Sequence, residues 1–501
     1  MSWLKTQSTL KTRLIVGVSL AVMVAFAAYI SLAVFTQTSL RLDEAQSLFQ
    51  TNRDIGGMLY LIAQDVHVPL YHTLLHYWQV FFGNDIYTAR LMSVVFFLAT
   101  IPAVYLLGSY VYKRRVGLFA ALLVTISPFI NWYGSEARMY SMLAFFTVIH
   151  QFAFIKLFRE GKPSHWVWFT VTAILGIYTH YFFAFVLLTE AIFFLMYSKK
   201  FAPKKALRKF VISAAVVVGS LLPWLYYVYT LGSASNTKPN LSEPTSIDLF
   251  NTYAQFIFGF QSDTFNTVII SLWPIIVLLA FFGLQKTNKV SKETIFFITA
   301  AVAPVIVAFI ISVTVRPFYQ SRYLIVALPA LFIFISWAIS IYPKKISIIL
   351  RSLLVLAISG LFIVQIVNRD TPVKEDYQQA VGYLNEKATS QDVIVLSAPF
   401  TIYPTEYYYE GGAKVTTQPI WNRFEQGSVP AFDPSKLENE VEKNTGSYQT
   451  AWLMLSYDQG YNDKIKKYYD THFTQLTKKE FSKNLWVYSY KIRYDPSISI
   501  E

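Results

Sequence analysis

The sequence of 501 residues contains no cysteine, and charged residues make up only 15% of it. Without cysteine the chain has no disulfide, no thiolate metal ligand and no cysteine nucleophile. Soluble domains average about 25% charged residues, so a chain this poor in charge is not expected to be soluble throughout. Hydrophobic residues make up 54% of the sequence, which favours a membrane protein.

Acidic residues are also scarce, with 30 Asp and Glu against 43 Lys and Arg, and the net charge is +13. The basic excess lies in the apolar part, because residues 1–367 carry 28 basic and 12 acidic residues while residues 368–501 carry 15 and 18. Basic residues beside apolar segments set membrane orientation and contact anionic lipids. We therefore expect membrane lipids as partners and no nucleic acid.

Apolar segments long enough to cross a bilayer, which takes about 20 residues, recur through the first part of the chain. We predict about 11 transmembrane helices, at residues 14–36, 87–111, 116–133, 139–155, 165–180, 181–197, 210–230, 264–284, 294–314, 323–342 and 346–367. The run from Ser164 to Tyr197 is too long for one span, so we divide it at Thr179-His180. The shorter stretch 251–260 is expected to be interfacial or re-entrant.

The distribution of Lys and Arg predicts the orientation of these spans. With a cytoplasmic N-terminus, the predicted inner loops carry 20 Lys and Arg and the short outer loops carry 6, in accordance with the positive-inside rule. Residues 37–86 then form the first outer loop, and the odd number of spans makes the C-terminal domain extracytoplasmic. We expect a multi-pass plasma-membrane protein whose first span is a retained anchor, since its apolar run continues beyond Ala25-Phe26-Ala27.

The composition changes after Val367, and residues 368–501 are predicted to form a soluble α/β domain. Residues 376–388 and 458–470 have helical patterns, and residues 392–397, 451–456 and 485–493 have the patterns of strands. The domain contains no catalytic motif that we identify. We interpret it as a module that binds the acceptor or packs against the rest of the chain.

Two adjacent carboxylates, Asp43 and Glu44, follow the first predicted span directly. They are either solvated charges beside a membrane helix or part of a site. Neighbouring residues on a helix face different directions, so one carboxylate can face a cavity while the other forms a structural pair.

The first outer loop also contains three of the seven histidines, His67, His72 and His76. Pro69 favours an extended or turn conformation at Val68, which would direct His67 towards a polar site. The alternative is ordinary polarity of an interfacial helix. The four-residue spacing of His72 and His76 is compatible with a metal site but is a weak signal alone.

Arginines on the predicted outer face are few, and each can hold an anion. Arg322 lies in a short outer loop, and a lipid phosphate suits the geometry of its guanidinium group. Glu136 and Arg138 share another short loop, where they either pair with each other or belong to a site. Arg90 lies near the outer end of the second span, where it either snorkels to head groups or serves a site. Glu190 lies in mid-span, where charge is costly and usually paired or functional.

The ordered motifs that contain these residues resemble the bacterial branch of the dolichyl-phosphate-mannose protein mannosyltransferase superfamily (glycosyltransferase family 39-like), membrane glycosyltransferases of the GT-C architecture. The motifs are Asp43-Glu44, DVHVPLYH at 65–72, ARLMSVVFFLATIPAVYLLG at 89–108, KRRVGLFAALLVTISPF at 113–129, GSEARMYSMLAF at 134–145, YTHYF at 178–182 and SRYLIVALP at 321–329. The sequence departs from the usual pattern at Val68, His72 and Ser135. The resemblance implies a polytopic GT-C fold over residues 1–367 with the catalytic loop at 37–86.

The resemblance also implies roles for individual residues. Asp43 would be the general base or a metal-site carboxylate, with Glu44 as its companion and His67 as a further catalytic residue. The residues at the donor phosphate would be Arg90, Arg138, Arg322 and Tyr323. Asp43 and Glu136 would share a divalent cation, Mg²⁺ or Mn²⁺, if one is used. The same motifs contain Tyr71, Tyr140 and His180, which we take as further site candidates.

The family implies transfer of a hexose or pentose from a polyprenyl-phosphate donor to a glycan, lipid or protein acceptor on the outer face, with inversion. Glycosyl transfer needs a carboxylate to accept a proton and cations to stabilise the leaving phosphate, and the candidate residues supply both. An alternative class is a transporter or lipid-linked glycan flippase, which predicts repeats and midplane ionisable residues. A third is a membrane-anchored binding protein whose tail carries the function.

Overall fold

The computed structural model describes residues 10–65, 67–201, 206–231, 241–262, 264–269, 271, 285, 290–368, 372–423 and 429–492. The chain divides into two compact units. The helical unit comprises Met1–Gln37, Val66–Thr230 and Pro239–Pro372, and the α/β unit comprises Thr38–Asp65, Leu231–Lys238 and Val373–Glu501.

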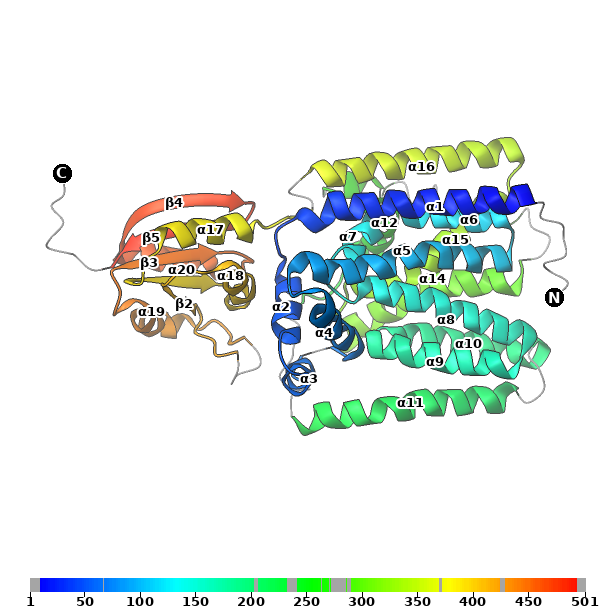
Figure 1. The fold of residues 1–501 in the computed structure, drawn as a ribbon, viewed down its shortest axis with the longest axis horizontal. Helices are drawn as coiled ribbons and strands as arrows, with labels where there is room; N and C mark the ends of the chain where they lie inside the picture. Colours follow the sequence, from blue (N-terminus) through cyan, green and yellow to red (C-terminus); the bar gives the residue numbers. More distant parts are fainter. Residues whose placement is uncertain are drawn as a thin grey trace. The chain divides into compact units, whose positions relative to one another are not determined.

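The helical unit consists of long apolar helices and short connecting segments (Figure 1). Its helices are α1 (Leu10–Ala33), α4 (Leu70–Phe82), α5 (Ile86–Val111), α6 (Arg114–Ile126), α7 (Pro128–Gly134), α8 (Tyr140–Glu160), α9 (Pro163–Thr179), α10 (Phe183–Phe201), α11 (Ala206–Thr230), α12 (Ser246–Phe258), α14 (Lys292–Thr314), α15 (Leu328–Ser340) and α16 (Lys344–Val367), with 3-10 helices at Phe35–Gln37 and Ser321–Ala327. Among the described residues, 7 helices are long and apolar enough to cross a membrane, or 8 if the bent pair α6 and α7 is one span.

These helices confirm the prediction of a polytopic helical membrane protein. Every predicted span except 264–284 coincides with helix, and most of residues 264–284 lie outside the described residues. The long apolar run is divided where predicted, since α9 ends at Thr179 and α10 begins at Phe183. The stretch 251–260 lies largely in α12, whose 13 residues are too few to cross a bilayer. The number of 11 spans stays a prediction.

The span formed by α6 and α7 is bent by 63° at its junction. Pro128 has no N–H, so a regular helix cannot continue through it. The Asn131 side chain donates to the carbonyl oxygens of Thr125 and Ser127 at 2.9 and 2.8 Å, and Gln365 of α16 donates to that of Pro128 at 3.2 Å. Freed carbonyls at membrane depth need such internal partners. The bend leads α7 into the loop that carries Glu136 and Arg138.

Helices α5 and α6 approach each other closely through two glycines. A Cβ atom built on Gly108 would lie 3.0 Å from the Cα of Gly117, and one built on Gly117 would lie 2.5 Å from the carbonyl oxygen of Tyr105. Small residues at such crossings let the two backbones pack together within the membrane.

We expect Gly117→Ala to destabilise the protein by about 1–3 kcal/mol, because the added methyl group would overlap backbone atoms of α5. Thermal unfolding of the purified protein in detergent measures the change. Gly360→Ala, in α16, is the matched control, since no atom lies within 4 Å of a Cβ built there. Equal melting temperatures for the two variants would contradict the proposed close packing.

The α/β unit contains a five-stranded sheet with helices on both faces (Figure 1). Its strands, in the order β2-β1-β3-β5-β4, are β1 (Asp392–Ser397), β2 (Lys414–Thr417), β3 (Thr450–Leu455), β4 (Thr474–Ser482) and β5 (Leu485–Lys491). Strands β2, β1 and β3 are parallel, whereas β5 and β4 are antiparallel to their neighbours. The predicted α/β class of the tail is therefore confirmed.

Successive side chains of β1 point to opposite faces of the sheet, so the core of this unit has two layers. Val393 and Val395 pack with α19 (Leu437–Thr445) and α20 (Asn462–His472) on one face, and Ile394 and Leu396 pack with α17 (Tyr377–Lys387) on the other. A strand covered on both faces is apolar along its length, which explains the apolar run from Val393 to Leu396 between Asp392 and Ser397.

Part of the first predicted outer loop belongs to this unit. It forms α2 (Leu42–Thr51) and α3 (Ile55–Ala63), and α2 packs against α18 (Ile402–Tyr408). The Leu40 N–H donates to the Tyr408 hydroxyl at 2.9 Å, and the Gln378 N–H donates to the Ser39 hydroxyl at 3.1 Å. The rings of Phe49 and Tyr403 lie 5.0 Å apart. Segments separated by more than 300 residues thus share one hydrophobic and hydrogen-bonded structure.

Candidate functional site

His67 and Arg138 form a buried pair within the helical unit. His67 lies three residues before the first residue of α4, and Arg138 lies in the loop between α7 and α8. The Arg138 Nη2 lies 2.9 Å from the His67 Nε2. Because a guanidinium group can only donate, this contact requires a lone pair on Nε2 and a proton on Nδ1 of a neutral imidazole. The pair places a permanent positive charge beside a histidine in a buried polar site.

Three further groups fix the backbone and side chains around this pair. The Tyr71 hydroxyl lies 3.0 Å from the Ser93 hydroxyl, which donates to the Arg138 carbonyl oxygen at 3.2 Å. The Arg138 N–H donates to the Glu136 carbonyl oxygen at 2.6 Å. Tyr71 comes from α4 and Ser93 from α5, so two helices hold one loop. These contacts hold the backbone of Arg138 in place.

Arg90 is a buried residue of α5, with only 1% of its surface exposed. Its Nη1 donates to the carbonyl oxygen of Thr36 at 2.9 Å. The side chain therefore does not snorkel to lipid head groups, which was one of the two predicted roles. Arg90 ties the end of the first membrane helix to α5, and its role at the donor phosphate stays a prediction.

Aromatic rings from three distant segments meet near the start of α8. The His180 ring lies 5.4 Å from the ring of Tyr323 and 6.4 Å from that of Tyr140. The guanidinium carbon of Arg322 lies 5.3 Å from the centre of the Tyr323 ring. The fold therefore brings together four predicted site residues from α8, the end of α9 and the 3-10 helix Ser321–Ala327.

A cavity of about 350 Å³ adjoins this aromatic group. Its lining includes Arg322, Asp248, Gln255 and Tyr319, and Tyr133 connects it to Tyr140, whose ring lies 5.1 Å away. The lining combines one guanidinium group, that of Arg322, with one carboxylate, that of Asp248. The guanidinium group can hold an anion such as a phosphate. The sequence did not identify α12 as part of a site, although Asp248 and Gln255 belong to it.

Asp43 and Glu44 lie in the first turn of α2, within the α/β unit. Glu44 is fully buried, and its Oε2 accepts from the Arg41 N–H at 3.0 Å. It therefore completes the N-terminal cap of the helix, a structural role. Asp43 is only partly buried, at the adjacent position. The two carboxylates thus have different surroundings, as their neighbouring positions on a helix predicted.

Glu375 and Tyr457, which sequence reasoning missed, lie near Asp43. Burial raises the pKa of the Glu375 carboxyl, the Arg41 guanidinium opposes that shift, and the charge of Asp43 adds to it. Burial likewise raises the pKa of the Tyr457 hydroxyl. No sequence signal relates residues more than 300 positions apart. A second carboxyl group and a phenol therefore share the surroundings of the predicted base.

The predicted metal site stays a prediction. Asp43 belongs to the α/β unit and Glu136, which is buried, to the helical unit. Within the residues that the structure describes, no group of three or more His, Cys, Asp or Glu side chains has the arrangement of a metal site.

Glu190 has a partner that the sequence did not reveal. Its Oε2 lies 2.8 Å from the His150 Nε2, and both side chains are buried. The His150 Nδ1 lies 2.8 Å from the Thr172 hydroxyl. The three residues come from α10, α8 and α9, so their pairing depends on helix packing. The Glu190 carboxyl group, which lies in the middle of a membrane helix, therefore has a partner within the protein.

Comparisons with known proteins agree on one fold. The family model described as dolichyl-phosphate-mannose-protein mannosyltransferase matches residues 66–227. ArnT from Cupriavidus metallidurans in the apo state is similar over 94% of this chain and 97% of its own, with 12% identity and a TM-score of 0.63. The same protein bound to undecaprenyl phosphate gives 11% identity, the same coverage and a TM-score of 0.61.

An archaeal protein has a similar fold, with a lower TM-score. The oligosaccharyltransferase AglB from Archaeoglobus fulgidus, in complex with an inhibitory peptide and a dolichol-phosphate, is similar over 96% of this chain and 74% of its own, with 12% identity and a TM-score of 0.52. No curated protein sequence matches the chain.

Proposed function

We propose that this multi-pass membrane protein, which has the fold of GT-C glycosyltransferases, transfers a sugar from a polyprenyl-phosphate donor to an acceptor on the outer face of the plasma membrane. The buried pair of Arg138 and His67 carries the proposal. It lies within the segment that the mannosyltransferase family model matches. Solved proteins of similar fold bind undecaprenyl phosphate and dolichol-phosphate, which supports a donor of this class.

The proposed reaction is a single displacement at the anomeric carbon. The acceptor hydroxyl oxygen attacks that carbon on the face opposite the phosphate, and the bond from the carbon to the phosphate oxygen breaks. Asp43 takes the proton of the hydroxyl group, and the polyprenyl phosphate leaves with the bonding electrons. Attack from the opposite face inverts the configuration.

Cations stabilise the negative charge that develops on the leaving phosphate. We assign this role to Arg138, whose guanidinium group is held by the contact with His67, and to Arg322, which lines the cavity of about 350 Å³. The Arg322 guanidinium group lies over the ring of Tyr323. Arg90 bonds the carbonyl oxygen of Thr36 and so connects α5 to the end of the first membrane helix. Arg138 is buried, and a charge in a buried position acts more strongly than it would in water.

A divalent cation, Mg²⁺ or Mn²⁺, remains part of the proposal as an optional partner of Asp43 and Glu136. Carboxylate oxygens are the ligands that such cations prefer. When bound, the cation would supply further positive charge at the phosphate. No step of the displacement is assigned to it, because Asp43, Arg138 and Arg322 account for the proton and the charge.

Reconstitution tests the proposed activity against the transporter alternative. The purified chain is placed in proteoliposomes with a polyprenyl-phosphate sugar, labelled in the sugar, and with glycan, lipid and protein fractions of the cell envelope. We expect label to move to one fraction with release of an equal amount of polyprenyl phosphate. Movement of labelled lipid between leaflets without any transfer product would instead support a flippase. Mass spectrometry of envelope glycans from a deletion strain then identifies the sugar and the acceptor.

A further inference from the structure

A second cavity, of about 670 Å³, lies in the helical unit at the opposite end of α5 from Arg90. Arg90 and Tyr112 are 22 positions apart, which corresponds to about 33 Å along a helix. The cavity is formed by the connection between α5 and α6, the end of α15 and the start of α16. It is therefore separate from the candidate site, and the proposed function does not use it.

Four cations line this cavity, and none of the described residues in its lining is acidic. They are Lys113, Arg115, Lys344 and Arg351. Arg351 lies with its guanidinium carbon 4.9 Å from the centre of the Phe119 ring, and its Nε is buried. Within the described part of the chain that Nε has no hydrogen-bond partner. A buried guanidinium N–H without a partner is costly, so an anion in the cavity would stabilise it.

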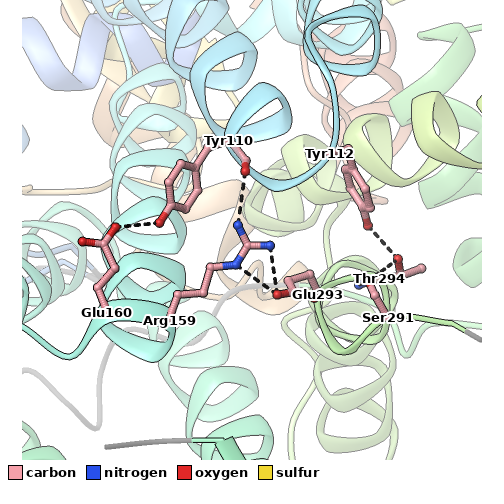
Figure 2. A network of polar contacts seen from close by, with 7 residues as sticks. All are labelled: Tyr110, Tyr112, Arg159, Glu160, Ser291, Glu293 and Thr294. Atoms are coloured by element: carbon pink, nitrogen blue, oxygen red, sulfur yellow. Dashed lines mark hydrogen bonds and ion pairs between the residues drawn. The ribbon is translucent and has the colours of Figure 1, made fainter. Parts of the chain in front are cut away.

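Arg159, at the same end of the helical unit, differs from the cations of the cavity because its guanidinium group is paired with a carboxylate. Its Nε donates to Glu293 at 3.0 Å, its Nη2 lies 2.9 Å from the same carboxylate, and its Nη1 donates to the Tyr110 carbonyl oxygen at 3.2 Å (Figure 2). The Tyr110 hydroxyl donates to Glu160 at 2.9 Å. This network joins α5, α8 and α14, and the charge of Arg159 is balanced by the carboxylate of Glu293.

Tyr112 joins that network to the cavity. Its hydroxyl lies 2.9 Å from that of Thr294 (Figure 2), and its ring stacks on Trp337 with ring centres 5.8 Å apart. Both rings line the cavity. Protein contacts thus hold the two aromatic rings in place. The four cations, in contrast, share the cavity with no acidic side chain from the part of the chain that the structure describes.

The surface beside the cavity is apolar and exposed. Ile348, which lines the cavity, and Ile349 and Leu353, which follow it on α16, are all more than half exposed. Aromatic and basic residues at the end of apolar helices mark the level of lipid head groups. Acyl chains can therefore follow the exposed face of α16 while a head group reaches the cations. This combination distinguishes a lipid from a free phosphate ion.

We propose that this cavity binds the head group of an anionic phospholipid, with its phosphate held by Lys113, Arg115, Lys344 and Arg351. Basic pockets between membrane helices are typical sites for such head groups. Four cations suit a lipid with two phosphate groups, so cardiolipin is the preferred probe, ahead of phosphatidylglycerol. Basic residues that only set the orientation of membrane helices need to be exposed in a loop. That role does not require a cavity lined by basic side chains.

Native mass spectrometry of the purified full chain tests this proposal. The protein is exchanged into detergent with cardiolipin or phosphatidylcholine, and the retained lipid is measured for the wild type and for Lys113→Gln/Arg115→Gln. The matched control is Arg114→Gln, an exposed residue between them that does not line the cavity. The double variant should bind cardiolipin about 30-fold more weakly, since each cation near an anionic lipid contributes about 1 kcal/mol. Arg114→Gln should bind as the wild type does.

Three results would overturn the lipid assignment. Equal retention of cardiolipin and phosphatidylcholine would show that charge does not select the ligand. An equal loss in Arg114→Gln would show that general basicity, rather than the cavity, attracts the lipid. Displacement of cardiolipin by millimolar inorganic phosphate would assign the cations to a soluble anion. Because all three readouts measure binding, none depends on glycosyltransferase activity.

Discussion

Asp43→Asn is expected to lower the rate of sugar transfer by about 10²- to 10⁴-fold, the range that a positioned general base contributes. The amide has nearly the shape of the carboxylate but cannot accept the proton of the acceptor hydroxyl group. Asp43 lies in the first turn of α2 and is not the capping residue, so the helix should persist. Transfer in proteoliposomes measures the rate, and the melting temperature measures folding.

Asp54→Asn provides the control for this variant in the same segment. Asp54 caps α3 through the Gly57 N–H, and asparagine caps a helix equally well. We expect full activity and an unchanged melting temperature. Wild-type activity in Asp43→Asn would show that Asp43 is not the base. Glu375 would then be the next candidate, since the charge of Asp43 raises the pKa of its carboxyl group.

Arg138→Lys should lower kcat by about 10²- to 10³-fold, comparable to the loss of one donor to a developing oxyanion. Lysine keeps the charge but loses the planar guanidinium group, which contacts His67 and, in the proposed reaction, would hold the phosphate at the same time. If Arg138 only anchored the loop, the variant would show a lower melting temperature with a smaller loss of kcat. Steady-state kinetics at saturating donor separates these cases.

Arg316→Lys is the matched control for this substitution. Arg316 lies between α14 and the 3-10 helix Ser321–Ala327, outside the proposed phosphate contacts. Activity within twofold of the wild type is expected. A similar loss in both variants would mean that the kinetics report general damage to the outer loops.

Much of the fold could be predicted from the sequence because membrane spans and buried strands have strong local signals. The strand at 392–397 has the predicted bounds, since a strand covered on both faces is continuously apolar. The strand β4 was missed because it lies at the edge of the sheet and most of its residues are exposed. The bend at Pro128 was also missed. Proline is a local signal for a break, but the contact with Gln365 of α16 that helps to stabilise the bend depends on tertiary packing.

The candidate site was predictable only where residues belong to local motifs. His67, Arg138 and Tyr71 were found from their motifs, and the structure brings them into one network. The partners that depend on long-range packing were not found. His150 is 40 positions from Glu190, and Glu375 is more than 300 from Asp43, so neither pairing leaves a pattern in a single sequence.

The packing of residues 38–65 into the α/β unit has a consequence for the order of biosynthesis. The segment that carries Asp43 is translated early, yet its hydrogen-bond and ring partners Gln378, Tyr403 and Tyr408 are translated more than 300 residues later. Domains generally fold as units as the ribosome releases them. The segment therefore acquires its native packing only near the end of translation. A ribosome that stalls before residue 373 therefore releases a chain in which the segment around Asp43 lacks its packing partners.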